Sequence, residues 1–225
     1  MSRSIFLLTL ILALQLVEAR HLIVAGGPAL RKWEELRPEK QQHDLWWANF
    51  IRASTIRIDE LRDKYNSPYD ITWIVYKPAY EKRSMEDGKP LTEWIEGQAS
   101  KRNVTLVWVN SNAELLTAFN THKSYSIKTF DYFGHSNKYC FMLDYGCHVM
   151  AASKAWLHES DLSKINPNLF SRTAFCKSYG CHTGESMSGY WKQHFNVPLI
   201  GAIGKTNYKQ VGKGKMPSVK GSWTK

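Results

Sequence analysis

Short apolar segments alternate with longer amphipathic segments along most of this sequence, and that alternation limits the folds open to the chain. The apolar segments are rich in β-branched and aromatic residues, which favour strands. They lie at 21–27, 70–76, 104–109, 127–133, 173–180 and 197–204. Strands that alternate with helices are typical of a largely parallel sheet with helices on both faces. The sequence therefore predicts an α/β fold with three layers, α/β/α.

The segments between these strands carry the three- and four-residue apolar spacing of helices. A helix over about 38–65 would place Trp47, Ile51 and Ile58 on one face. Another should begin after Ser111, because Ser111 and Glu114 have the spacing of a capping box. Further helices are expected at about 91–101, as a short helix at 158–165, and directly after the strand at 173–180.

The first 19 residues have the pattern of a signal peptide. A basic start at Arg3 precedes the run IFLLTLILALQLV, and Val17-Glu18-Ala19 fits cleavage before Arg20. No later segment approaches the roughly 20 apolar residues that a membrane-spanning helix needs. We expect a secreted or periplasmic protein with one α/β domain at 20–208 and a basic C-terminal tail at 209–225.

The chain carries a formal net charge of +10, which raises the question of an anionic partner. The basic residues are scattered, however, until 205–225, which contains six Lys and no acidic residue. We therefore predict no specific nucleic-acid partner, and read the tail as a solvated segment whose one expected contact is with anionic surfaces. The sequence leaves the oligomeric state open.

Two of the predicted strands end in residues suited to covalent catalysis. Gly134-His135-Ser136 follows the strand at 127–133, and Gly180-Cys181-His182-Thr183-Gly184 ends the strand at 173–180. In parallel sheets the reactive crevice lies beyond the carboxyl ends of the strands. An imidazole beside a thiol takes its proton or forms an ion pair with the thiolate. His135 and Cys181 are thus the candidate catalytic pair.

The two glycines have predicted roles in the same site. Gly134 and Gly180 permit tight turns, and the backbone N–H groups of Gly180 and Cys181 could face a developing oxyanion at the start of a helix. No cofactor is predicted. Cys176, Cys181 and His182 form a C-x4-C-H run without a matched second pair of ligands, so a zinc site is not indicated.

The Gly-His strand end and the Cys-His-Thr-Gly strand end resemble the caspase-like cysteine peptidases, in particular the metacaspase and CHAT-type branches. FMLDYG and LHESDLSKI are similar to the strand, turn and short helix that lie between the two motifs in that clan. The resemblance implies a three-layer caspase-like fold, His135 as general base, Cys181 as nucleophile and a peptide or protein as substrate. Gly134, Gly180 and the Cys181 amide would line the oxyanion site.

Two positions depart from the family pattern. Ser136 stands where many members have Gly, and Tyr179 stands where metacaspases often carry a substrate-binding Asp. A preference for basic substrates is therefore not carried over. Four acids, Asp44, Asp131, Asp161 and Glu185, are candidates for a specificity pocket, without a basis in the sequence for choosing among them.

Three alternatives stay open at the level of sequence. Cys181 could form a disulfide with Cys176, as Cys140 could with Cys147 across a hairpin. The chain could keep a caspase-like scaffold for binding alone. Finally, Gly134-His135-Ser136 begins like the G-x-S-x-G elbow of serine esterases, although Lys138 stands where that elbow needs a small residue.

Overall fold

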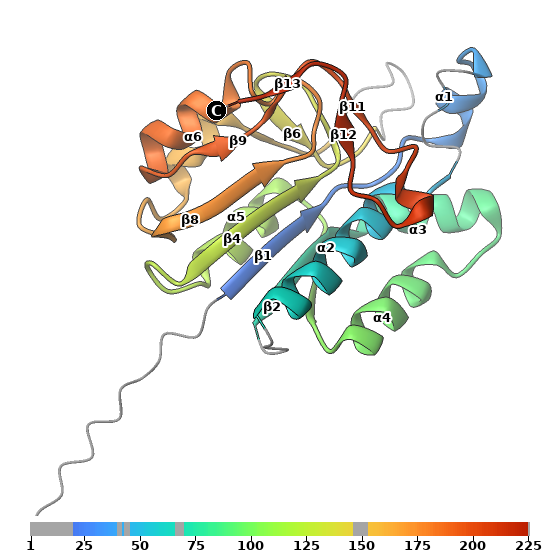
Figure 1. Ribbon diagram of the computed structural model, residues 1–225. Helices are drawn as coiled ribbons and strands as arrows, with labels where there is room; N and C mark the ends of the chain where they lie inside the picture. Colours follow the sequence, from blue (N-terminus) through green and yellow to red (C-terminus); the bar gives the residue numbers. More distant parts are fainter. Residues whose placement is uncertain (1–19, 40–41, 43–45, 66–69, 146–152, 225) are drawn as a thin grey trace, which may run out of the picture.

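The computed structural model describes residues 20–39, 42, 46–65, 70–145 and 153–224. The predicted signal peptide and Cys147 lie outside these residues. Within them, no helix combines the length and the apolar character that crossing a bilayer requires. One central sheet organises the described chain (Figure 1).

The central sheet has six strands in the order β3-β2-β1-β4-β8-β9, and every neighbouring pair is parallel. This confirms the predicted α/β fold with a mostly parallel sheet between helices. Its strands are β1 (Arg20–Ala25), β2 (Ile71–Tyr76), β3 (Thr105–Val109), β4 (Ile127–Phe133), β8 (Phe170–Ser178) and β9 (Leu199–Ile200).

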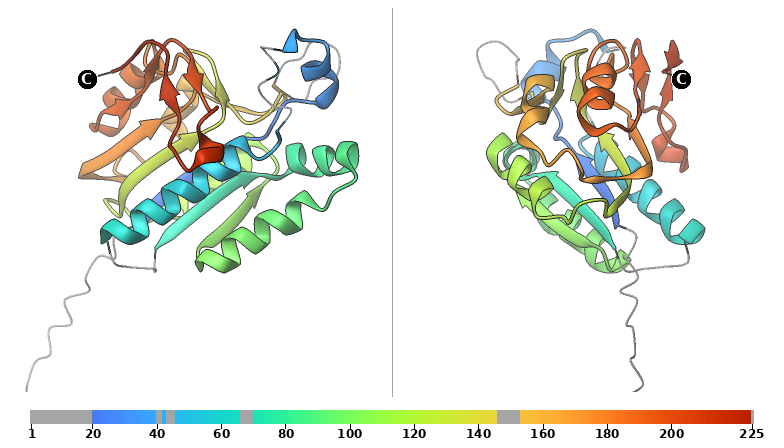
Figure 2. Two further views of the ribbon diagram at one scale, coloured as in Figure 1. Left: turned by 45° about the vertical axis from the view of Figure 1, so that its right-hand side comes forward. Right: turned by 90° about the vertical axis from the view of Figure 1, so that its left-hand side faces the viewer.

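The strands are rich in apolar residues because both faces of the sheet are covered. In β1, Leu22 and Val24 belong to one core cluster, and Ile23 and Ala25 to the other. Helices α2, α3 and α4 pack on the Ile23 side, and α5 and α6 on the Leu22 side (Figures 1 and 2). The helices are α1 (Arg31–Glu35), α2 (Asn49–Tyr65), α3 (Lys77–Asp87), α4 (Leu91–Arg102), α5 (Asn112–Asn120) and α6 (Met187–Phe195).

Helix α5 is capped much as predicted. The Ser111 hydroxyl accepts a hydrogen bond from the Glu114 amide at 3.2 Å. The Glu114 carboxylate accepts from the Asn110 amide at 2.9 Å, one residue earlier than a capping box would have it. The short helix before β8 is also present, as a 3-10 helix at Glu159–Lys164.

Two helical starts differ from the predictions, and α1 and α3 were not predicted. Helix α2 begins at Asn49, not near residue 38. Eight residues, 179–186, separate the end of β8 at Ser178 from the start of α6 at Met187. Helix α3 was not predicted because only Tyr80 and Arg83 are buried along it, which leaves no apolar stripe to detect.

The C-terminal segment folds onto the domain and is not a solvated tail. Strand β11 (Thr206–Asn207) pairs with β12 (Ser218–Val219), and β10 (Ala202–Ile203) pairs with β13 (Ser222–Trp223). Val211, in the short 3-10 helix Val211–Lys213, is 1% exposed and belongs to the core cluster that includes α2. The lysines described in this segment therefore belong to a folded part of the domain.

Candidate active site

The candidate site lies at the carboxyl ends of β1 and β4, where successive strands stop being added on one side of β1 and begin to be added on its other side. The chain leaves β1 toward β2 and β3, then returns to the other side of β1 as β4. Gly26, directly after β1, donates a backbone hydrogen bond to the carbonyl of Phe133 at 2.8 Å, so the carboxyl ends of β1 and β4 meet. Ligands of open α/β sheets bind at such a switch point. His135 lies two residues beyond the end of β4.

His135 is held by its backbone on two sides. It belongs to β5 (His135–Ser136), which pairs antiparallel with β6 (Cys140–Met142), and β6 pairs in turn with β7 (Trp156–His158). The Tyr132 hydroxyl lies 2.6 Å from the carbonyl oxygen of His135. These contacts fix the backbone position of His135, from which its imidazole side chain extends.

The His135 ring is partly exposed and stands between two aromatic rings. Phe50, from the first turn of α2, meets it edge to face with ring centroids 5.1 Å apart. Tyr145 meets it in the same manner at 4.6 Å. Because α2 runs back from this edge of the sheet, its first turn brings Phe50 to the site. Such contacts restrict the orientation of the imidazole.

Cys181 follows β8, the neighbour of β4. The register pairs Tyr132 with Ser178, and the Tyr179 amide donates to the Tyr132 carbonyl at 2.8 Å. Cys181 is a partly exposed free thiol, so a disulfide with Cys176 is absent. Cys176 is a buried free thiol in the core, and burial raises its pKa. Cys140 is also free.

A hydrogen bond joins the two segments that carry the candidate pair. The Ser136 hydroxyl donates to the carbonyl oxygen of Cys181 at 2.6 Å. The structure thus brings the segments of His135 and Cys181 together at the ends of adjacent parallel strands. Ser136 itself lies in β5 opposite Phe141, and the strand-to-helix turn of an esterase elbow does not follow it.

The sulfur of Cys181 has contacts that the sequence did not predict. The Thr206 amide donates to Sγ at 3.3 Å, and the Thr206 hydroxyl oxygen lies 3.3 Å from the same sulfur. The hydroxyl of nearby Tyr208 donates to the Tyr179 carbonyl at 3.0 Å. Both residues come from a Lys-rich stretch with no periodic apolar pattern, so its composition gave no signal of a role in the site.

The glycines of the site are required by close approach, and not by the turn conformation that we predicted. Neither Gly134 nor Gly180 has a positive φ. A β-carbon on Gly134 would lie 2.4 Å from the Tyr132 hydroxyl oxygen, and one on Gly180 would lie 2.3 Å from that of Ser136. Neighbouring side chains therefore occupy the space of a side chain at both positions.

The backbone amides predicted to face an oxyanion differ in availability. The Gly180 amide donates to the Ser178 hydroxyl at 3.2 Å, and the Gly134 amide donates toward the Tyr208 hydroxyl. Among the described residues, none accepts a hydrogen bond from the Cys181 amide. An oxyanion at this site would thus meet the Cys181 amide, whereas the two glycine amides have internal partners.

The acids considered for a specificity pocket have structural roles where they are described. Asp131 is fully buried and pairs with Arg57 at 2.8 Å. Asp161 accepts from the His158 amide in the cap of the short 3-10 helix. Glu185 accepts from His182 at 2.6 Å, and this hydrogen bond lowers the pKa of Glu185. Asp44 lies outside the described residues.

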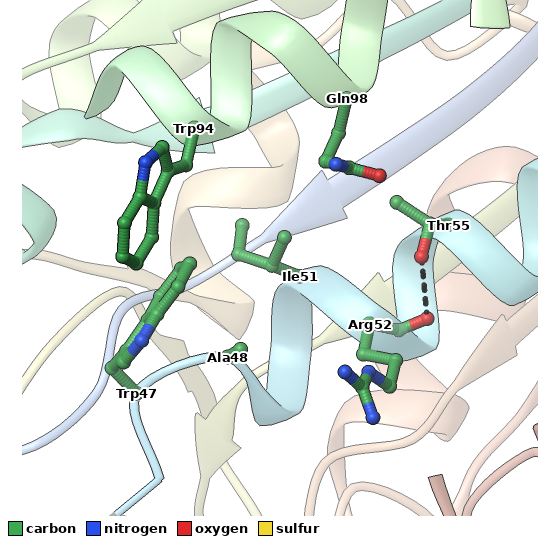
Figure 3. Close-up of a pocket in the computed structure, with 7 residues that line it drawn as sticks. All are labelled: Trp47, Ala48, Ile51, Arg52, Thr55, Trp94 and Gln98. Atoms are coloured by element: carbon green, nitrogen blue, oxygen red, sulfur yellow. Dashed lines mark hydrogen bonds between the residues drawn. The ribbon is translucent and has the colours of Figure 1, made fainter. Parts of the chain in front are cut away.

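A separate hollow of about 240 Å³ lies between α2 and α4 (Figure 3). Trp47 and Trp94 form one end of it, with ring centroids 5.9 Å apart, and Thr55 and Gln98 lie toward the other. The first turn of α2 divides it from the His135 side, because Phe50 meets His135 whereas Ile51 lines the hollow. The described residues contain no cluster of three or more His, Cys, Asp or Glu side chains arranged for a metal ion.

Comparisons of the chain with protein-family models, with curated proteins and with solved structures found no match. What the site can do is therefore argued from its geometry.

Proposed function

We propose that this protein is a cysteine endopeptidase of caspase-like type, with Cys181 as nucleophile and His135 as general base. The observation that carries the proposal is the junction of the two segments. A partly exposed free thiol and a partly exposed imidazole follow adjacent parallel strands, and the Ser136–Cys181 hydrogen bond ties their backbones together at the switch point.

The reaction follows from these groups. His135 accepts the thiol proton, and the Cys181 sulfur attacks the carbonyl carbon of a peptide bond. The carbonyl oxygen becomes negatively charged within reach of the Cys181 amide. The C–N bond then breaks as the His135 imidazolium returns the proton to the leaving amine. Water, activated by the neutral imidazole, hydrolyses the thioester and restores the thiol.

The resemblance to the caspase-like clan supports this assignment through chain order. The His motif follows the fourth strand of the chain, the Cys motif follows β8, and a small antiparallel sheet and a short helix lie between them. Tyr179 replaces the family's substrate-binding acid, and it is buried against Phe133 with ring centroids 4.8 Å apart. We propose no preference for basic substrates, and we propose export through residues 1–19.

Site-resolved alkylation tests the proposal. In the chain starting at Arg20, iodoacetamide should label Cys181 faster than Cys140 or Cys176 at neutral pH, and His135→Ala should reduce that rate by at least tenfold. His182→Asn is the matched control, because it removes the other nearby imidazole while Asn tolerates the positive φ of 64° there. It should keep the labelling.

Cleavage of a mixed peptide library by the wild type, and its loss in Cys181→Ala, would establish the substrate class. Labelling that falls mainly on Cys140, or that is indifferent to His135→Ala, would contradict the peptidase.

A non-catalytic caspase-like binding domain is the second candidate. One observation favours it: the sulfur of Cys181 is engaged by the amide and hydroxyl of Thr206. A sulfur held in that way could be structural. Slow alkylation of Cys181 together with an intact fold would support the binding domain over the enzyme.

A further inference from the structure

The C-terminal hairpin reaches the thiol from outside the central sheet. Thr206 pairs with Val219 across β11 and β12, and the Lys220 amide donates to the Lys205 carbonyl at 2.8 Å. This pairing fixes the main chain of Thr206, and the His182 amide, which donates to the Gly204 carbonyl at 2.8 Å, ties the same segment to the loop of Cys181. The backbone amide of Thr206 is therefore held beside the sulfur before any substrate arrives.

The contacts of Thr206 favour a negatively charged sulfur. Its backbone amide can only donate, so Sγ is the acceptor of that hydrogen bond at 3.3 Å. Its hydroxyl, also at 3.3 Å, accepts from the thiol when Cys181 is protonated and can rotate to donate when Cys181 is ionised. A hydrogen bond to an ionised group is about twice as strong as a neutral one.

We propose that Thr206 is a positioning residue that holds the sulfur of Cys181 and stabilises its thiolate, so that the C-terminal hairpin completes the nucleophile. The part of this proposal that concerns catalysis rests on the proposed peptidase function. The effect of Thr206 on the Cys181 thiol does not depend on that function, because ionisation of the sulfur can be measured without any substrate.

The other titratable groups around the sulfur allow this effect to be isolated. Desolvation raises the pKa of Tyr132 and of Tyr208 well above the ordinary value, so both remain neutral while a thiol titrates. Among the described residues, other charged or ionisable groups on the neighbouring segments include His135, Lys138, Cys140 and Tyr145 after β4, His182 and Glu185 in the turn after Cys181, and Lys205 and Lys220 on the hairpin. None of these is altered by a change at position 206.

The test is the pH profile of Cys181 alkylation by iodoacetamide, with each cysteine followed by peptide mass spectrometry. Thr206→Val keeps the backbone amide and the shape of the side chain but removes the hydroxyl. We expect Cys181 to react about fivefold to tenfold more slowly at neutral pH in this variant. At strongly alkaline pH, where the thiolate forms in either protein, the rates should converge. Thr206→Ser retains the hydroxyl and should stay within about twofold of the wild type.

Equal rates at neutral pH would overturn the proposal, and so would a difference that persists at alkaline pH, since that would reflect access to the sulfur. Circular dichroism checks the fold, and Thr206→Ala replaces the Val variant if it unfolds. If Thr206→Val shifts the pH profile of Cys181 alkylation but the wild type cleaves no peptide, the role of Thr206 stands and the peptidase function is refuted. Conversely, if the wild type cleaves peptides but Thr206→Val leaves the pH profile of Cys181 alkylation unchanged, the peptidase function stands and the role of Thr206 is refuted.

Discussion

The Ser136 hydroxyl oxygen lies 2.3 Å from the point where a β-carbon on Gly180 would stand, so these two residues interlock at the ends of β4 and β8. The same hydroxyl donates to the Cys181 carbonyl. A small change on either side of this contact would therefore displace the main chain that carries Cys181.

Gly180→Ala should disturb the site through this contact. The new methyl group would overlap the Ser136 side chain and approach Tyr132 at 3.2 Å. Overpacking of this kind costs about 1 to 3 kcal/mol. We expect a lower midpoint of urea unfolding and at least tenfold slower alkylation of Cys181.

The double variant Gly180→Ala with Ser136→Gly is the control for that prediction. Removing the Ser136 side chain clears the closest overlaps, at 2.3 and 2.8 Å, although the Tyr132 contact remains. The double variant should recover part of the stability that Gly180→Ala loses. If the two changes are instead simply additive, the interlock is not the cause of the effect.

Ser136→Ala separates the two nucleophiles that the sequence suggested. The change removes one hydrogen bond to a carbonyl, worth about 0.5 to 1.5 kcal/mol, and leaves the thiol in place. We expect Cys181 alkylation and any peptide cleavage to fall by about tenfold or less. Complete loss of hydrolysis, with Cys181→Ala still active, would point to Ser136 as the nucleophile.

Much of the central sheet could be predicted from local sequence. Strand β4 occupies the predicted residues 127–133, where β-branched and aromatic residues predominate and six of the seven residues are buried. The positions of His135 and Cys181 beyond two strand ends followed from the same signal. That β4 and β8 are neighbours did not, since strand order depends on long-range packing.

The remaining parts of the site lacked any local pattern. Strand β11 has two residues, too few for a period-2 repeat, and its partner β12 begins eleven positions after it ends. That pairing and the hydrogen bond from the His182 amide to the Gly204 carbonyl place Thr206 beside Cys181. The roles of Gly134 and Gly180 were likewise hidden, because the side chains that crowd them come from other positions in the fold.

Arg57→Met should destabilise the domain strongly. Asp131 is fully buried, and Arg57 donates to its carboxylate at 2.8 Å. Breaking a buried pair by removing one partner costs about 3 to 5 kcal/mol. The free energy of unfolding from urea titration at neutral pH measures this loss.

The loss in Arg57→Met should shrink in acid. Burial raises the pKa of Asp131 to about 6 even beside Arg57, and without the guanidinium it should rise further. An acid with a raised pKa in the folded state favours folding when protonated, and that contribution is lost as the pH rises through the folded value. A deficit that is as large at pH 5 as at pH 7 would show that Asp131 is not the cause. Asp131→Asn in the Arg57→Met background should relieve it.

His21 should make stability depend on pH in the opposite direction. Burial lowers its pKa to about 4, with Arg57, Lys128 and Lys64 adding to the effect. Because the unfolded chain binds the proton more readily, stability should increase from about pH 4 to about pH 6.5 and stay constant above. We expect His21→Asn to lose roughly 1 to 2 kcal/mol of that rise, after allowance for solvent screening. Thr129→Val, which removes the 2.9 Å partner of the His21 ring, is the control and should keep the rise. A wild type and a His21→Asn variant with parallel stability curves over this range would mean that the imidazole takes up its proton without unfolding the strand.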